Sequence, residues 1–240
     1  MTFYEKMYKT FQPAVAWVYR VHPVNPENVP DCGVILACNH TSFADVLVLS
    51  AALKRQVRYM AKKELFKIPL LSQLIRALGA YPVDRGGADV GSIKRTIAMV
   101  EEGELIGIFP QGHRYGKQDP RFTEIKPGVG MIAYHTKAPV VPVFIDNAKM
   151  KTAMFRKNYV YFGKPLYFDQ LGYQSGGRVE YMNASKLIFD HVCAIKYGDS
   201  LIAAQREVIG GADGVKYVKL SDEASDGGRT KAEPEDQSDE

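Results

Sequence analysis

The sequence predicts an α/β domain built on a mixed, largely parallel β-sheet flanked by helices. Short β-branched or apolar runs alternate with segments of helical length over most of the 240 residues, and this order of elements is typical of such sheets. With 46% hydrophobic residues, the chain can bury one substantial core. We find no internal repeat, so one domain with end segments is the simplest organisation.

Short runs rich in β-branched or apolar residues predict the strands. In order, they are GVILACN (33–39), QVRYMA (56–61), GAYPV (79–83), ELIGIF (104–109), PVVPVFI (139–145) and a late strand or edge, YVYFGKPLYF (159–168). The intervening and following segments predict helices over 43–54, 69–79, 89–103, 128–137 and 178–196.

The chain divides into three expected parts. Residues 1–27 form an N-terminal segment, residues 28–200 the main domain, and residues 201–240 an acidic tail expected to be disordered. The last twenty residues contain eight acidic and two basic side chains, a formal charge of −6, whereas the whole chain carries +4. The first 220 residues therefore carry +10, which favours an anionic partner: a phosphorylated small molecule, an acidic lipid headgroup or nucleic acid.

The cysteine content and hydropathy exclude several classes. Cys32, Cys38 and Cys193 are an odd number in a chain without a recognisable signal peptide, so we expect reduced, structural thiols in a cytoplasmic protein. Cys32, Cys38 and His40 lack the CxxC spacing of zinc sites, and we expect no metal. No apolar run approaches the ~18–20 residues that a spanning helix needs, so we expect the chain not to cross a membrane.

The stretch CNHTSFAD (38–45) joins two apolar segments and carries the first candidate site. Ligands of open α/β sheets bind beyond the carboxyl ends of strands, so His40 and Asp45 are candidates for a base and its orienting carboxylate. Ser42 followed by Asp45 also matches a capping box at a helix start, and the two interpretations are compatible. No nucleophile motif accompanies them, which favours direct attack by a substrate hydroxyl or water.

Two further polar clusters follow expected strands. VDRGG (83–87) carries Arg85 among glycines, a setting that suits phosphate recognition but also an ordinary charged turn. FPQGHRYGKQDPRFTEIKPGVG (109–130) is long, basic and glycine-rich. It fails the P-loop pattern yet favours an anion site, and the alternative is a solvated loop. KPG (126–128) then opens a helix whose N-terminal N–H groups could also hold an anion.

Together these blocks resemble the 1-acylglycerol-3-phosphate acyltransferase family, the NHxxxxD glycerolipid acyltransferases. The matching blocks are NHTSFAD (39–45), GAYPVDR (79–85), FPQGHR (109–114), KPG (126–128) and VPV (141–143). The resemblance implies the glycerolipid acyltransferase fold, with residues 28–200 as the acyltransferase domain. It implies transfer of a fatty acyl group from acyl-CoA or acyl carrier protein to the sn-2 hydroxyl of 1-acylglycerol-3-phosphate (lysophosphatidate), giving phosphatidate in phospholipid biosynthesis.

The resemblance also implies roles for individual residues. His40 would be the general base and Asp45 its orienting carboxylate, with no cofactor beyond the acyl thioester. The implied substrate-binding residues are Asn39, Arg85, Gln111, Gly112, His113, Arg114, Lys126 and Gly128. The third block departs from the family pattern, because Gln111 stands where the family usually has Glu and His113 where it has Thr or Ser. Another lysophospholipid or glycerol-3-phosphate is therefore an alternative acceptor.

Because such substrates are lipids, we expect association with an acidic membrane surface, peripherally at the cytoplasmic face of the cell membrane. Pro13 predicts a break that divides the N-terminal segment into two short amphipathic helices. Residues 69–78 form a second amphipathic candidate. In both cases the alternative is packing into the core. The apolar N-terminal face consists of Tyr4, Tyr8, Phe11, Val15 and Val18.

Other functions are open at this point. A phosphate-ester or thioester hydrolase would use His40 and Asp45 to activate water, and a non-catalytic basic protein would bind acidic lipids by charge alone. Nucleic-acid binding is disfavoured, because the basic residues lie in glycine-rich loops without a recognition helix or an RNA-type aromatic signature.

Overall fold

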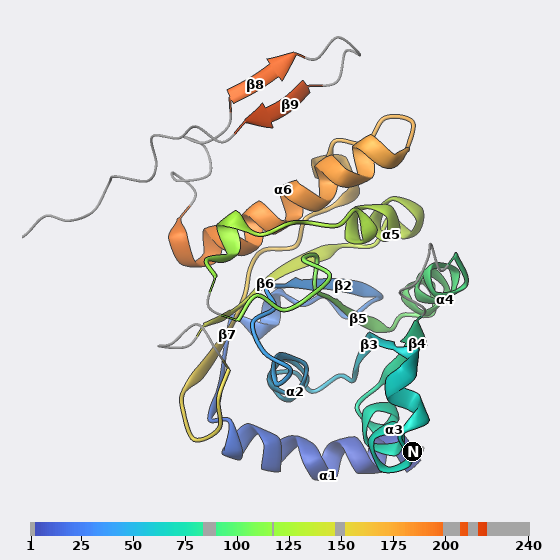
Figure 1. The fold of residues 1–240 in the computed structure, drawn as a ribbon, viewed down its shortest axis with the longest axis vertical. Helices are drawn as coiled ribbons and strands as arrows, with labels where there is room; N and C mark the ends of the chain where they lie inside the picture. Colours follow the sequence, from blue (N-terminus) through green and yellow to red (C-terminus); the bar gives the residue numbers. More distant parts are fainter. Residues whose placement is uncertain are drawn as a thin grey trace, which may run out of the picture. The chain divides into compact units, whose positions relative to one another are not determined.

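The computed structural model describes residues 3–83, 90–116, 118–146 and 152–198, and two short strands further on. The chain separates into two compact units, Met1–Tyr197 and Gly198–Glu240. The first unit has helices on both faces of one sheet (Figure 1), which confirms the predicted fold class. In the second unit the described residues form an antiparallel hairpin of β8 (Glu207–Gly210) and β9 (Lys216–Lys219). This hairpin lies within the range predicted to be disordered, and the rest of that range lies outside the described residues.

Within the described part of the first unit, seven strands form one sheet in the order β1-β7-β6-β2-β5-β3-β4. Five neighbouring strands run parallel, from β6 through β2, β5 and β3 to β4. Strand β7 pairs antiparallel with β6, and β1 pairs parallel with β7. The strand bounds are β1 (Val21–Val24), β2 (Val34–Cys38), β3 (Val57–Lys62), β4 (Ala80–Val83), β5 (Leu105–Ile108), β6 (Val140–Asp146) and β7 (Asn158–Phe162).

Most of the predicted strands are present within a residue of their expected ends. The late strand is shorter than predicted, because β7 ends at Phe162 and only Leu166 rejoins the sheet, through a bridge to Val140. Strand β1 was not predicted. Its sequence, VHPV, is short, contains a proline and has no fully buried residue, so it lacks the apolar pattern that marks the other strands.

The helices divide between the two faces of the sheet (Figure 1). Along β2, Ile35 and Ala37 pack toward α5 and α6, whereas Leu36 and Cys38 pack toward α1 and α2. Burial of both faces explains why β2 reads as a continuous apolar run. The helix bounds are α1 (Phe3–Val18), α2 (Asp45–Ala51), α3 (Pro69–Ala77), α4 (Val90–Glu101), α5 (Gly128–Thr136) and α6 (Arg178–Tyr197).

Helix α1 continues through Pro13, so the predicted break into two short helices is wrong. A proline inside a helix removes a backbone hydrogen bond and costs ~3 kcal/mol or more, and tertiary contacts stabilise α1 across this point. The amide of Gln12 donates to two backbone carbonyls at and just beyond the end of α2. Val15 and Val18 pack against the core, so this half of the predicted membrane-facing stripe faces inward. No helix among the described residues combines the length and hydropathy of a membrane span.

The topology brings the carboxyl ends of three strands to one edge of the sheet. Strand β2 lies between β5 and β6, and all three run parallel. The chain returns to β5 on one side of β2 and then crosses to β6 on the other, which is the kind of switch point where open α/β sheets form ligand crevices. The carboxyl ends of β2, β5 and β6 therefore lie side by side.

Candidate active site

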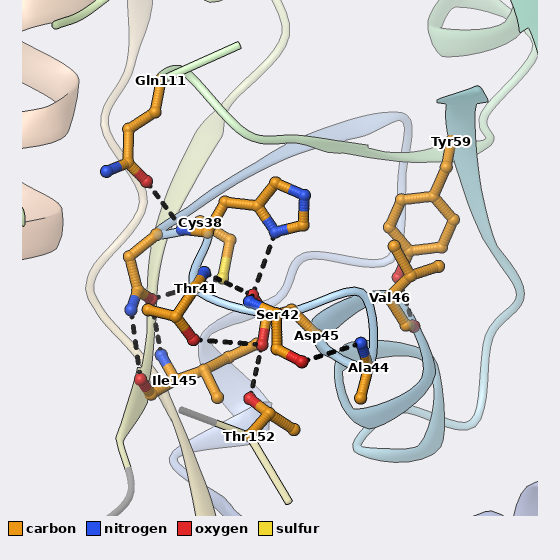
Figure 2. Close-up of polar contacts among 12 residues, drawn as sticks. Cys38, Thr41, Ser42, Ala44, Asp45, Val46, Tyr59, Gln111, Ile145 and Thr152 are labelled. Atoms are coloured by element: carbon orange, nitrogen blue, oxygen red, sulfur yellow. Dashed lines mark hydrogen bonds and ion pairs between the residues drawn. The ribbon is translucent and has the colours of Figure 1, made fainter. Parts of the chain in front are cut away.

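The carboxylate of Asp45 is fully buried at the start of α2 and is hydrogen-bonded on both oxygens (Figure 2). Its Oδ2 accepts from the backbone N–H groups of Thr41 (2.6 Å) and Ser42 (2.8 Å). Its Oδ1 accepts from the hydroxyl of Thr152 and, at 3.5 Å, from that of Thr41. A buried carboxylate is costly unless such donors surround it, so these bonds hold the charge in one orientation.

His40 completes the set of donors. Its Nδ1 lies 2.9 Å from Oδ2 of Asp45, which confirms that the two predicted side chains pair. A carboxylate only accepts, so Nδ1 carries the hydrogen and Nε2 keeps its lone pair when the ring is neutral. The side chain of His40 is 15% exposed and that of Asp45 is 0% exposed, so the imidazole is the part of the pair that a ligand can reach.

The same carboxylate also binds a backbone N–H group in the turn before α2. Asp45 accepts from the N–H of Ser42, which is one half of the predicted capping box. The other half differs, because Oγ of Ser42 accepts from the N–H of Ala44 (3.3 Å), while the N–H of Asp45 donates to the Ser42 carbonyl (3.2 Å). Asp45 therefore closes the turn that leads into α2 and pairs with His40 at the same time.

The segment after β5 holds His40 from the other side. The His40 ring stacks on Phe109, with ring centroids 4.0 Å apart and an interplanar angle of 19°. The backbone N–H of His40 donates to Oε1 of Gln111 (2.6 Å), and its carbonyl accepts from the N–H of Tyr115 (2.9 Å). Ring and backbone of the histidine are thus both bound by one stretch, FPQGHRY.

Asn39 and Gln111, both predicted to bind substrate, are buried, with exposures of 2% and 1%. The amide of Asn39 donates to the Ile145 carbonyl (3.1 Å) and accepts from the Ile145 N–H (2.7 Å), which ties the end of β2 to β6. The amide of Gln111 binds His40 on one side and donates to Oγ1 of Thr123 (2.8 Å) on the other. Both amides are engaged by protein groups, and these contacts do not support the predicted contact with substrate.

The predicted cationic residues lie in the loops that hold His40. His113, Arg114 and Lys126 are exposed. The guanidinium carbon of Arg114 lies 5.8 Å from the centroid of the Phe43 ring, in the loop before α2. Lys126 pairs with Glu124 and thereby lowers the pKa of that carboxyl. These side chains offer hydrogen-bond donors for an anionic group on the segment that also contacts the backbone of His40.

The remaining predicted residues have distinct placements. Gly112 has a φ of 73°, and a Cβ there would lie 3.1 Å from Cγ of Lys126, so this turn requires glycine. Gly128 is the first residue of α5 and faces open space, with Pro127 at the N-cap. Arg85 lies outside the described residues. Among the residues that are described, no group of three or more His, Cys, Asp or Glu side chains could hold a metal ion.

Cys38 is the buried thiol at the end of β2. Burial and the negative charge of Asp45 raise the pKa of the Cys38 thiol well above its usual value. The thiol therefore stays protonated, and its Sγ lies 3.6 Å from Oδ1 of Asn39 as a weak donor. A buried, neutral thiol is a poor nucleophile, so Cys38 is not suited to carry an acyl group.

Comparison with known proteins places this geometry in a family. Residues 20–146, which include every predicted site residue, match the family model described as Acyltransferase. This chain belongs to the acyltransferase family. The acyltransferase is 37% identical over 147 residues to the 1-acyl-sn-glycerol-3-phosphate acyltransferase of Bacillus subtilis (strain 168), an alignment that covers 60% of this chain and 72% of that protein.

Two other known proteins resemble this acyltransferase. It is 28% identical over 151 residues to the 1-acyl-sn-glycerol-3-phosphate acyltransferase of Streptococcus pneumoniae. This alignment covers 60% of this chain and 55% of that relative, little more than half of its length. Its fold resembles the crystal structure of the 1-acyl-sn-glycerophosphate (LPA) acyltransferase PlsC from Thermotoga maritima, with a TM-score of 0.56, 23% identity and 80% of each chain covered.

Among the residues that contribute to the site without having been predicted are Phe109, Thr123 and Thr152. Phe109 begins the FPQGHR block, and an aromatic residue directly after a buried strand is a weak signal for ring stacking. Thr123 lies in the same basic segment but has no distinguishing pattern. Thr152 has no sequence signal, because its partner Asp45 lies 107 residues away in the chain.

Proposed function

We propose that this acyltransferase moves a fatty acyl group from an acyl thioester to the sn-2 hydroxyl of 1-acylglycerol-3-phosphate and so forms phosphatidate. The observation that carries the proposal is the 2.9 Å hydrogen bond between Nδ1 of His40 and Asp45, which leaves Nε2 of a partly exposed ring available as a base. The name of the Bacillus subtilis relative supports the choice of reaction and acceptor.

His40 acts as the general base in this proposal. Its Nε2 takes the proton of the acceptor hydroxyl while the hydroxyl oxygen attacks the thioester carbonyl. Asp45 stabilises the imidazolium that forms, because its buried carboxylate faces the Nδ1–H. The new C–O bond forms, the C–S bond breaks as the tetrahedral adduct collapses, and the proton passes from Nε2 to the departing thiolate. Base assistance of this kind contributes ~10²–10⁴-fold.

In this proposal the acceptor phosphate binds to exposed basic side chains on the segment that contacts the backbone of His40. The guanidinium of Arg114 suits bidentate contact with phosphate oxygens, and His113 and Lys126 supply further donors. Lys126 is engaged with Glu124, but both side chains are half-exposed or more. An exposed pair of this kind contributes little to stability because solvent screens it, so a phosphate competes for Lys126 at little cost. Arg85 belongs to the proposed phosphate site from its sequence block alone.

Exposed apolar side chains support association with a membrane surface. Trp17, near the end of α1, is 74% exposed and makes an edge contact with the 64%-exposed Phe155, at a centroid distance of 6.3 Å. On α3, Leu70 is 83% exposed. Helices α1 and α3 lie on the same side of the sheet (Figure 1). Large exposed apolar groups of this kind are typical of surfaces that enter a lipid interface.

The proposal is tested with purified protein, an acyl thioester and 1-acylglycerol-3-phosphate in detergent, with phosphatidate measured by mass spectrometry. Acyl-CoA and acyl carrier protein are compared as donors. His40→Ala should lower kcat by ~10²–10⁴-fold, whereas His135→Ala, at an exposed position in the last turn of α5, should not.

Three outcomes would contradict it. Free fatty acid formed without consumption of the acceptor would identify a hydrolase. If lysophosphatidate does not react and another lysolipid does, the proposed acceptor is wrong. Wild-type activity in His40→Ala would show that His40 is not the general base.

A further inference from the structure

Gln111 joins the candidate base to the far end of the basic segment. Its Oε1 accepts the backbone N–H of His40 at 2.6 Å, and its Nε2 donates to Oγ1 of Thr123 at 2.8 Å. The hydroxyl of Thr123 in turn donates to the carbonyl of Pro120 at 2.7 Å. Figure 2 shows the carboxamide of Gln111 turned toward the loop after β2. With 1% exposure, this side chain is enclosed by protein.

The direction of these hydrogen bonds determines which side chain fits. The hydrogen of the Thr123 hydroxyl is used on the Pro120 carbonyl, so its oxygen offers only lone pairs to position 111. The backbone N–H of His40 offers only a hydrogen. The side chain at 111 must therefore accept on one side and donate on the other, which a carboxamide does and a carboxylate does not.

Charge favours the carboxamide as well. Oε1 of Gln111 and Oδ2 of Asp45 accept from consecutive backbone N–H groups, those of His40 and Thr41. A carboxylate at position 111 would be a second buried anion close to Asp45, and buried like charges oppose ionisation. The neutral Gln111 supplies the acceptor without that repulsion.

From these contacts we infer that Gln111 is a positioning residue for the acyl transfer, not a contact of the acceptor hydroxyl. It sets the backbone of His40 relative to the segment that carries Arg114 and Lys126. The N–H of Tyr115 on the His40 carbonyl (2.9 Å) and the N–H of Lys126 on the Pro110 carbonyl (2.8 Å) complete this frame. The inference rests on the proposed role of His40 as the base.

Four substitutions separate the parts of this arrangement. Q111M removes both hydrogen bonds at similar length, and Q111E keeps the acceptor but removes the donor. T123V removes the oxygen that Gln111 binds, and T123S retains it. The matched control is Q118E, in the same segment, where the exposed amide of Gln118 donates to the Phe122 carbonyl at 3.1 Å.

Kinetics give the first readout. Q111M should lower kcat by about 10- to 100-fold, the loss expected for a displacement of ~1 Å in a catalytic group, and should leave KM for the acceptor nearly unchanged. T123V should lower kcat less, and T123S should restore it. For Q111E the ratio of activity to wild type should rise as pH falls, because the protonated carboxyl regains a donor for Thr123. The ratio for Q118E should not follow pH.

The second readout does not depend on activity. In ¹⁵N–¹H NMR spectra of the folded protein, the amide proton of His40 should move upfield in Q111M and exchange faster with solvent, because a short hydrogen bond is lost. An unchanged His40 amide would overturn the contact itself. If the His40 amide signal changes in Q111M but kcat stays at the wild-type value, the positioning role is wrong. A raised KM for the acceptor at constant kcat would contradict it as well. A changed amide in a protein whose wild type transfers no acyl group would support the contact and reject the proposed function.

Discussion

Thr152 donates its hydroxyl hydrogen to Oδ1 of Asp45, across 107 residues of the chain (Figure 2). The donors of Oδ2 come from the loop after β2, whereas this donor comes from the segment before β7. The orientation of the carboxylate, and with it the imidazole of His40, thus depends on two parts of the sheet that meet only in the folded protein.

Substitution of Thr152 should cost both stability and rate. T152V keeps the shape and removes the donor, so the free energy of unfolding should fall by ~1.5–3 kcal/mol, the range for hydrogen bonds to charged groups. We expect kcat to fall too, and T152S to restore both. Urea unfolding and initial rates measure the two effects. The matched control is T136V, where the hydroxyl donates to a neutral backbone carbonyl within α5; equal losses in both variants would contradict a special role for Thr152.

Removal of the exposed aromatic pair should weaken vesicle binding without unfolding the protein. W17A and F155A should each lower affinity for anionic vesicles by about 10- to 100-fold, since full burial of a large apolar side chain is worth ~1.5–3 kcal/mol. Cosedimentation measures binding, and V179A, at an exposed valine on the opposite face in α6, is the control. Deletion of residues 1–20 is unsuitable, because Val15, Val18 and Tyr19 pack in the core. Unchanged binding in both aromatic variants would contradict the membrane proposal.

Gly130 should tolerate no side chain. A Cβ at this position would lie 2.1 Å from the Tyr181 carbonyl oxygen of α6, while the Gly130 N–H donates to Oγ of Ser185 at 2.9 Å. G130A must therefore separate α5 from α6, and we expect a loss of ~1–3 kcal/mol or more, measured as a lower Tm. G128A, in the same helix but facing open space, should be neutral or slightly stabilising. Similar Tm values for the two variants would contradict the close packing of α5 on α6.

Asp119 should give the protein a pH-dependent component of stability. Burial alone would raise the pKa of Asp119, but its hydrogen bonds and ion pair with Arg121 (2.6 Å) lower the pKa on balance. A carboxyl whose pKa is lower in the folded state stabilises it above the unfolded pKa, about 4, and loses that contribution as pH falls through the folded pKa. The stability difference between wild type and D119N should therefore shrink below about pH 4, as measured by urea unfolding. A constant difference between about pH 2 and pH 6 would contradict this.

Local pattern was sufficient for the central strands of the sheet and for the first pair of site residues. The central strands are apolar runs because helices cover both faces, and such runs are visible without any partner. His40 and Asp45 are five residues apart in one loop, so their pairing needs only a strand end followed by a helix start.

Long-range contacts instead determined the partners of the Asn39 and Gln111 side chains and the continuity of α1 through Pro13. Asn39 and Gln111 lie in the loops expected to bind substrate, yet their partners are Ile145, Thr123 and the backbone of His40. Whether an amide faces a ligand or a neighbouring strand depends on which strand ends become adjacent, and a sequence block does not contain that order. Likewise α1 remains one helix through Pro13 because the core covers Val15 and Val18. Short-range pattern thus defined most of the elements and the pairing of His40 with Asp45, while the sheet order β6-β2-β5 decided which groups hold His40, because that order places distant backbone and side-chain groups within hydrogen-bond distance.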